Sequence, residues 1–230
     1  MKIEPNYNGF QEFFSENQKN AKEEFKSLNE EFSGIFDEVI KLGVGTNLGA
    51  GQKQKGTAIT FYLRAAKYLY TSYDLSITGH TEESRILLRN AIELLILGFL
   101  ISEKDDVYNL WLECYDLRIK NTDKHGNVDM ELAKEKRFWV SQIRTGHLKF
   151  LEDSKDTSHL YTTWKDFSTR YSHENMYNLA VRIETNDDRT EIYIGDGYDS
   201  KTRRMPQNLH LILDIMKDIL SFIKKIKQEI

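Results

Sequence analysis

Three charged side chains recur at every fourth position in a segment that is nearly all apolar from Ile86 onward. Residues 81–101 read TEESRILLRNAIELLILGFLI and carry Arg85, Arg89 and Glu93 at intervals of four. In a helix these residues share one face, so together with Asn90 they form a polar ridge on a rod that is apolar elsewhere. Such a helix belongs in a protein core, where unpaired charges are costly. We therefore expect a second polar element to meet this buried ridge.

A polar segment near residue 170 is the best candidate for that second element. Residues 167–175 read FSTRYSHEN, at the predicted end of a helix. We expect Tyr171, Ser172 and His173 to contact the ridge. His173 could act as a general base near neutral pH, and Arg170 could stabilise an anionic transition state. The alternative is a purely structural role, in which His173 favours the end of its helix.

The remaining residues that could hold a metal or a nucleotide do not form a recognised motif. None of the six histidines belongs to an H-E-x-x-H pattern, and the single cysteine, Cys114, cannot build a zinc–thiolate site or an internal disulfide. The glycine-rich residues 43–56 lack the spacing of a P-loop, and a flexible connector is the better interpretation. We expect neither a metal nor a cofactor.

Composition limits the class of protein. The formal net charge of -4 argues against a protein that coats nucleic acid through bulk positive charge, although a local basic patch is compatible with it. The N-terminal residues lack the apolar core of a signal peptide. The longest apolar run, near residues 94–101, is far shorter than the roughly 20 residues that span a bilayer. We therefore expect a soluble cytoplasmic protein that makes no membrane contact.

Apolar periodicity predicts a mainly α protein, an antiparallel helical bundle. The two prolines, Pro5 and Pro206, leave the middle of the chain free of helix breakers. Helices are expected near residues 7–42, 57–78, 81–101, 105–118, 128–152, 157–172 and 205–230. The second and third of these form a tight antiparallel hairpin, and Thr81 is predicted to cap the N-terminus of the ridge helix.

Alternating apolar and polar residues predict one β-hairpin between the last two long helices. Leu179, Val181 and Ile183 alternate with Ala180, Arg182 and Glu184 before a turn at residues 186–189, and residues 190–194 repeat the pattern. A lone hairpin is marginal in water, so we expect it to lie on the helices or to pair with another chain.

Two segments resemble a known group of proteins. SRILLRNAIE at residues 84–93 and FSTRYSH at residues 167–173 look like the LLRxxxE helix and the distal SxxxH element of uncharacterised prokaryotic helical proteins. That group is similar in outline to the HEPN proteins of toxin–antitoxin and phage-defence systems. The resemblance implies a helical core and, for the ribonucleases, metal-independent RNA cleavage at a dimer interface by an R-x(4–6)-H motif. Arg118 and His125 have that spacing, whereas Arg170 and His173 are closer together.

We expect a single helical domain over residues 1–230. Residues 1–56 hold the N-terminal helix and the glycine-rich loop, residues 57–175 the HEPN-like core, residues 176–200 the hairpin and residues 205–230 the C-terminal helix.

Three functions are compatible with these patterns. The first is a non-catalytic HEPN-like module that binds a protein partner or a second copy of itself, in a phage-defence or toxin–antitoxin context. The alternative is a metal-independent endoribonuclease, with His173 or His125 as the base and Arg170 or Arg118 as the anion stabiliser. The third is a small-ligand sensor whose pocket is lined by the polar ridge.

Overall fold

The computed structural model describes residues 7–44, 52–120, 147–170, 183–186, 189–192 and 204–229. The helices are α1 (Tyr7–Glu24), α2 (Lys26–Val44), α3 (Lys53–Ile77), α4 (Thr81–Glu103), α5 (Asp105–Lys120), α7 (Leu148–Asp153), α8 (Ser158–Arg170) and α10 (Arg204–Gln228). In the described residues, none of these helices is both long enough and apolar enough to cross a membrane.

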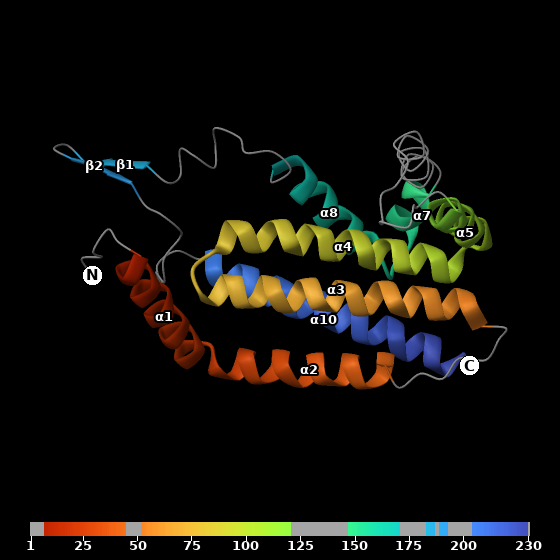
Figure 1. Ribbon diagram of the computed structural model, residues 1–230, viewed down its shortest axis with the longest axis horizontal. Coiled ribbons are helices and arrows are strands. Elements are labelled where there is room, and N and C mark those ends of the chain that lie inside the picture. The colour runs from red at the N-terminus through yellow and green to blue at the C-terminus, as the bar shows by residue number, and fades with distance from the viewer. Residues whose placement is uncertain are drawn as a thin grey trace.

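The long helices α2, α3, α4 and α10 form the bundle (Figure 1). Helices α3 and α4 pack against each other along their lengths as an antiparallel hairpin, and α10 contacts both of them as well as α2. Helices α5 and α8 pack on α4, and α7 packs on α8, so they form an outer layer on one side of the bundle. Helix α1 lies at the edge of the bundle and contacts α2 and α3.

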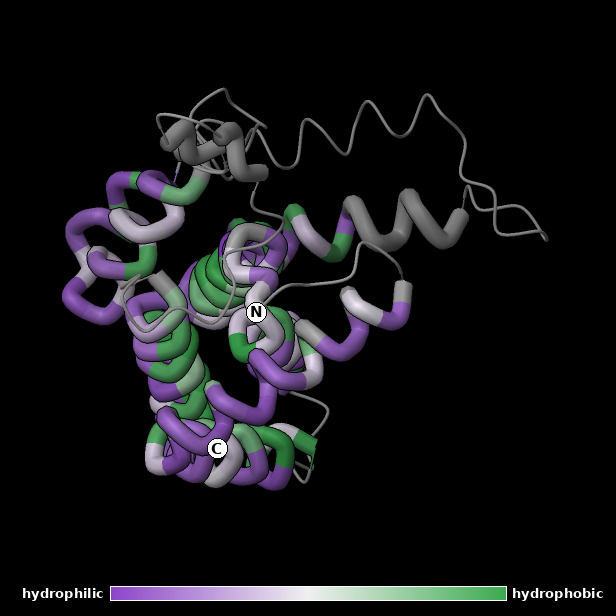
Figure 2. The backbone as a smooth tube through the Cα atoms, turned by 90° about the vertical axis from the view of Figure 1, so that its left-hand side faces the viewer, coloured by the Kyte–Doolittle hydropathy of each residue, from purple (hydrophilic) through white to green (hydrophobic). Residues whose placement is uncertain are grey.

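Apolar side chains from the long helices fill the centre of the bundle. Hydrophobic residues are frequent in the helices at the centre of the view, and hydrophilic residues are mixed with them in the outer helices (Figure 2). Small residues let α3 and α4 approach closely. A Cβ atom added to Gly98 of α4 would lie 2.5 Å from Cε1 of Tyr62 in α3, so only glycine fits there without displacing the ring.

The turn between α3 and α4 differs from the prediction. Gly79 adopts a positive φ of 90°, which suits a residue without a side chain, and the residue at the N-cap is His80. Thr81 is already the first helical residue, and its hydroxyl is buried without a hydrogen-bond partner among the described residues. The predicted Thr81 cap is therefore wrong, because the tight turn starts α4 one residue early.

The mainly helical prediction is confirmed, with changes at several boundaries. The helix expected over residues 7–42 is divided at Phe25 into α1 and α2. Helix α3 begins at Lys53, inside the predicted glycine-rich loop. Of the helix expected over residues 128–152, only the end, within α7, lies in the described residues.

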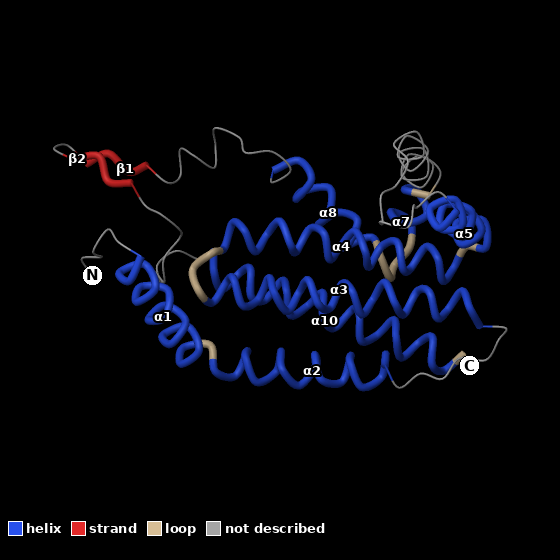
Figure 3. Tube along the Cα trace, in the orientation of Figure 1, coloured by secondary structure: helices blue, strands red, loops and turns tan. Residues whose placement is uncertain are grey.

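The predicted fold class is contradicted in its β component. The body of the described molecule consists of helices alone (Figure 3). Two segments of four residues each, β1 (Ile183–Asn186) and β2 (Arg189–Ile192), pair with one another in antiparallel fashion, and no helix has an extensive contact with either. Two such short segments bury too little surface to form a layer of a fold. The expectation of a hairpin built onto the helices was wrong, and the bundle is all-α.

Candidate functional site

The polar ridge of α4 is met by a tryptophan of α8. Nη2 of Arg89 lies 3.2 Å from Oε1 of Glu93, one helical turn away. The indole Nε1 of Trp164 donates a hydrogen bond of 2.9 Å to the same carboxylate oxygen. A second polar element therefore meets the ridge, as expected, but Trp164 was not among the predicted partners.

The ridge is half-buried, whereas the sequence predicted a buried one. The four residues Arg85, Arg89, Asn90 and Glu93 all have intermediate exposure. The Arg89 side chain is 24% exposed and the Glu93 side chain 33%. The physical reason is that the ridge lies on the side of α4 that faces the outer layer, which covers it only in part.

The two predicted catalytic histidines and the two predicted ridge partners fall outside the described part of the chain. They are His173 and His125, and Tyr171 and Ser172. Arg118 belongs to α5, and Arg170 is the last residue of α8. The Arg–His pairs and their contact with the ridge therefore stay predictions.

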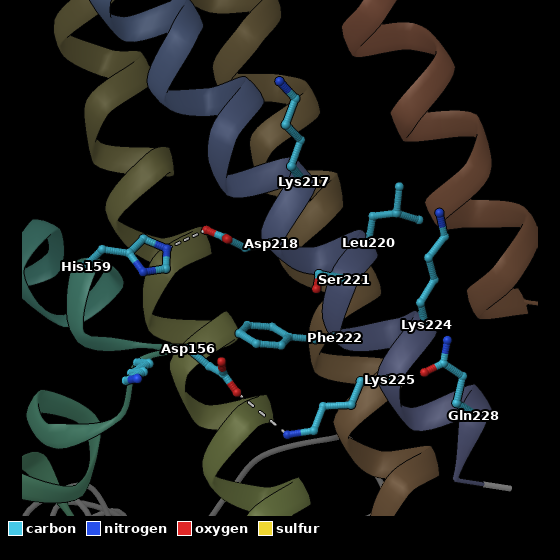
Figure 4. A pocket seen from close by; sticks show the side chains of 11 residues that line it. Asp156, His159, Lys217, Asp218, Leu220, Ser221, Phe222, Lys224, Lys225 and Gln228 are labelled. Atoms are coloured by element: carbon cyan, nitrogen blue, oxygen red, sulfur yellow. Dashed lines mark hydrogen bonds and ion pairs between the residues drawn. The ribbon is translucent and has the colours of Figure 1, made fainter.

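A groove of about 730 Å³ runs along α10 beside the start of α8 (Figure 4). Its charged lining residues are Lys155, Asp156, His159, Lys217, Asp218, Lys224 and Lys225. The first three come from the turn before α8 and from its first turn, and the others come from α10. Leu220 and Phe222 add apolar surface between them. The groove thus combines many charged groups with a smaller apolar surface, and most of these residues lie on helices.

An imidazole and a carboxylate join the two walls of this groove. Nε2 of His159 lies 2.8 Å from Oδ2 of Asp218. The His159 side chain is 54% exposed and the Asp218 side chain 25%. Burial raises the pKa of Asp218, and the nearby Asp214 adds to this effect, while His159 opposes both. A cationic or hydrogen-bonding partner stabilises the half-buried carboxylate of Asp218, and His159 provides that partner.

Two of the groove's lysines on α10 are held by carboxylates of α2. Nζ of Lys217 lies 2.8 Å from Oε1 of Glu31, and Nζ of Lys224 lies 2.7 Å from Oε1 of Glu38. The hydrogen bond to Glu31 raises the pKa of Lys217, so its ammonium form is favoured. Both glutamates belong to α2, so these ion pairs connect the groove's lysines on α10 to the neighbouring helix α2.

The third groove lysine on α10 bridges two other elements. Nζ of Lys225 lies 3.2 Å from Oε1 of Glu103 and 3.7 Å from Oδ2 of Asp156. Lys155 has no ion pair with any described residue. The four lysines of the groove are accompanied by five carboxylates: the two that line it and the three glutamates that pair with its lysines. With His159 neutral, the site carries no surplus of positive charge.

In a second histidine–aspartate pair the histidine, and not the aspartate, is the more buried partner. Nε2 of His147 lies 3.1 Å from Oδ2 of Asp106, and here the histidine is 18% exposed and the aspartate 72%. The hydrogen bond from His147 lowers the pKa of Asp106. Both pairs were missed because their members lie 41 and 59 residues apart, a separation that leaves no local sequence pattern.

Four buried polar residues fasten α3, α4 and α10 together. The single hydroxyl hydrogen of Ser72 goes to the backbone oxygen of Ser84 at 2.8 Å. Ser84 must then donate in the 2.8 Å contact with Ser72, and Ser76 must donate in its 2.7 Å contact with Ser84. Nδ2 of Asn208 donates to Ser76 at 2.7 Å and to Ser84 at 2.8 Å. Each donated hydrogen has an acceptor, and only the amide oxygen of Asn208 is buried without a partner among the described residues, so the cluster links the three helices.

No family model, curated protein or solved structure matches this chain. Among the described residues, no three histidine, cysteine, aspartate or glutamate side chains are grouped to hold a metal ion. Function is therefore argued from the groove along α10 and from the contacts of its lining residues.

Proposed function

We propose that this chain is a non-catalytic helical module that binds a segment of a protein partner in the groove along α10. The charge balance of the groove carries this proposal. RNA and other polyanions are held mainly by unpaired cations that displace counterions from phosphates. Here four lysines are accompanied by five carboxylates, so a polyanion gains little at this surface. A protein segment, which offers hydrogen bonds and apolar contacts as well as charge, fits the site better.

The dimensions and composition of the groove support the same choice. A volume of about 730 Å³ is within the range of sites that hold small ligands or a few residues of a peptide. Leu220 and Phe222 supply apolar contacts, and Ser221 and Gln228 supply uncharged hydrogen-bonding groups. The walls are helices with buried anchors, so the surface is preorganised and costs little ordering on binding.

The biological setting belongs to the proposal as well. The motifs at residues 84–93 and 167–173 support a HEPN-like relationship and, with it, a role in phage defence or in a toxin–antitoxin system. Self-association is the form of this proposal in which the partner segment comes from a second copy of the chain.

A photo-crosslinking experiment tests the proposed surface. A photoreactive residue at Ser221, which is exposed inside the groove, should form an adduct with one protein, and the same residue at Lys67, exposed on α3, should not. The partner identified by mass spectrometry is then purified, and its affinity for the chain is measured. Lys224→Glu should weaken that affinity about tenfold or more, because it reverses a charge in the lining of the groove. Lys67→Glu is the matched control.

Two results would contradict the proposal. One is an adduct at Ser221 that ribonuclease removes, which would indicate RNA in the groove. The other is a purified partner whose affinity is unchanged by Lys224→Glu.

A metal-independent endoribonuclease is the second candidate, and one observation favours it. The imidazole of His159 is oriented by Asp218 at the edge of an open groove, with the ammonium group of Lys155 in the same lining. An oriented imidazole and a cation are the parts that such a reaction uses. The test is cleavage of a fluorescent RNA oligonucleotide by the purified chain in EDTA. Cleavage that is lost in His159→Ala, His173→Ala or His125→Ala would establish this candidate.

A further inference from the structure

One row of exposed residues runs along the outer side of α10. Its members recur at alternating intervals of three and four, and they are Gln207, His210, Asp214, Lys217, Ser221, Lys224 and Gln228. A repeat of about 3.5 residues keeps a second helix in step with the first, whereas an extended segment repeats every two residues. In the middle of the row the small side chain of Ser221 lies between Lys217 and Lys224, and all three line the groove. The groove therefore fits a helix that presents groups of opposite charge seven residues apart.

Helix α2 carries a row of this kind on its own exposed side. The exposed residues Glu30, Gly34, Asp37 and Lys41 follow one another at intervals of four, three and four. The two carboxylates stand seven residues apart, as the two lysines of α10 do. Between them, Gly34 has no atom within 4 Å of an added Cβ, so packing within the chain does not require a glycine in the middle of this helix. A glycine at that point leaves room for a second helix to approach closely.

Ion pairs within the chain fix the register of the two rows. Lys217 pairs with Glu31, and Lys224 pairs with Glu38. From the first pair to the second, both helices advance by seven residues, so α2 and α10 run parallel (Figure 1). Positions 31 and 217 therefore lie at one level along the bundle, and positions 38 and 224 lie at another.

A two-fold axis converts that register into a contact between two copies of the chain. If the axis is parallel to these helices and lies on the solvent side of the α2–α10 pair, it places α2 of one copy over α10 of the other. It also leaves every residue at its own level along the bundle. Glu30 is one residue before the ion-pair partner of Lys217, so in the second copy it is level with that lysine to within about the 1.5 Å rise of one residue. Asp37 and Lys224 correspond in the same way.

We infer that the partner at the groove is a second copy of this chain, with α2 of each copy lying along α10 of the other in a closed two-fold dimer. The inference rests on the proposed function, because it names the partner of the same surface. Lys217 and Lys224 then each lie between a carboxylate of their own α2 and a carboxylate of the second copy's α2. The acidic row of α2 has Lys26 and Lys41 at its ends, and such mixed charge suits a groove without a surplus of positive charge.

Charge reversal followed by mixing tests this inference on the full-length chain. Sedimentation equilibrium measures the Kd of the natural chain, which we expect to dimerise at concentrations up to about 200 μM. Lys217→Glu/Lys224→Glu and Glu30→Lys/Asp37→Lys each place like charges across the interface, so each pair of substitutions should raise the Kd at least about tenfold. When the two variants are mixed, opposite charges meet again at every such contact, and a heterodimer should form with nearly the natural affinity. This recovery also shows that both variants are folded.

Gly34→Gln keeps the test decisive if the charge-reversed variants lose structure. The added side chain meets nothing in its own chain, so the fold is kept, but it obstructs the approach of α2 to α10 of a second copy. We therefore expect Gly34→Gln to weaken dimerisation and Lys67→Gln, at an exposed position of α3, to leave it unchanged. A photoreactive residue at Ser221, in a mixture of isotope-labelled and unlabelled chains, should give mixed-isotope adducts at residues 30–37.

Three results would overturn the inference. They are a natural chain that stays monomeric over the whole concentration series, two folded variants that do not associate when mixed, and an adduct at Ser221 with a different protein. The last of these contradicts the dimer but leaves the proposed protein-binding groove intact. An adduct at Ser221 that ribonuclease removes contradicts the proposed function itself, so the two proposals fail on different observations.

Discussion

Trp164 Nε1 donates a 2.9 Å hydrogen bond to Oε1 of Glu93, and this bond ties α8 to the polar ridge of α4. The same oxygen lies 3.2 Å from Nη2 of Arg89. The Glu93 carboxylate thus contacts one residue of its own helix and one residue 71 positions away in the sequence. Because the site is half-buried and the acceptor is charged, this bond stabilises the fold more than an exposed ion pair does.

Removing the indole donor should destabilise the protein measurably. Trp164→Phe keeps an aromatic ring but loses the hydrogen bond to Glu93, and we expect it to lower the free energy of unfolding by about 1 kcal/mol. Urea denaturation gives this value. In a Glu93→Ala background, the same substitution should cost much less. An equal cost in both backgrounds would mean that the hydrogen bond contributes nothing.

Loss of the central hydroxyl of the buried cluster should cost more than loss of a peripheral one. Ser84 contacts Ser72, Ser76 and Asn208, so Ser84→Ala leaves several buried groups unpaired, and we expect a loss of about 2–3 kcal/mol. Ser72→Ala removes fewer contacts and should cost about 1 kcal/mol. Chemical denaturation of the two variants under one set of conditions ranks them. The reverse order would contradict the hydrogen assignment given above.

Two glycines should respond to the same substitution with opposite signs. Gly98→Ala places a Cβ atom 2.5 Å from the Tyr62 ring and should destabilise the protein by about 1–3 kcal/mol. Gly34 in α2 has no atom within 4 Å of an added Cβ, so Gly34→Ala should stabilise the protein by about 0.5–1 kcal/mol through helix propensity. Thermal unfolding of the two variants measures both shifts. A destabilised Gly34→Ala variant would contradict the open space at that position.

Tyr73 should lose little when its hydroxyl is removed. Its ring stacks on Phe32 at 4.1 Å, and its hydroxyl is buried without a partner among the described residues. Tyr73→Phe keeps the stacked ring, so we expect a neutral or slightly stabilising effect in chemical denaturation at neutral pH. Burial raises the pKa of Tyr73 to about 12.

The same shift predicts a change in stability at alkaline pH. A pKa raised above the unfolded value gives a contribution that is complete below about pH 10 and is lost as the pH rises toward 12. Tyr73→Phe should therefore resist alkaline unfolding better than the natural chain. Equal alkaline midpoints would show that Tyr73 ionises as freely in the folded state as in the unfolded chain.

Asp106 should contribute to stability above its ordinary pKa and not at strongly acidic pH. The hydrogen bond from His147 lowers the pKa of Asp106, so the carboxylate stabilises the folded state at neutral pH. That contribution disappears as the pH falls below about 4 and through the lowered folded-state pKa. Asp106→Asn should thus be less stable than the natural chain at pH 7 and should lose this disadvantage in acid. Urea denaturation along a pH series makes the comparison, with Asp37→Asn on α2 as an exposed control.

The sequence by itself determined the helical elements and one requirement of the site. Periodicity is a local property, so α4, α8 and α10 were located within a few residues of their ends. The intervals between Arg85, Arg89 and Glu93 also required a second polar element beside α4, which the structure supplies. Alternation around residue 187, by contrast, predicted a component of the fold that is absent from the bundle, because local pattern carries no information about tertiary support.

The tertiary structure alone decided which side chains meet. Trp164 and Glu93 are 71 residues apart, His159 and Asp218 are 59 apart, and Asn208 and Ser76 are 132 apart. Each contact depends on how far one helix is rotated and shifted against another, and many rotations bury similar apolar area. The groove and its charge balance exist for the same reason. They combine side chains of α10, of the first turn of α8 and of the turn before it with the glutamates of α2 and α4 that pair with the lysines, and no one segment of the chain encodes them.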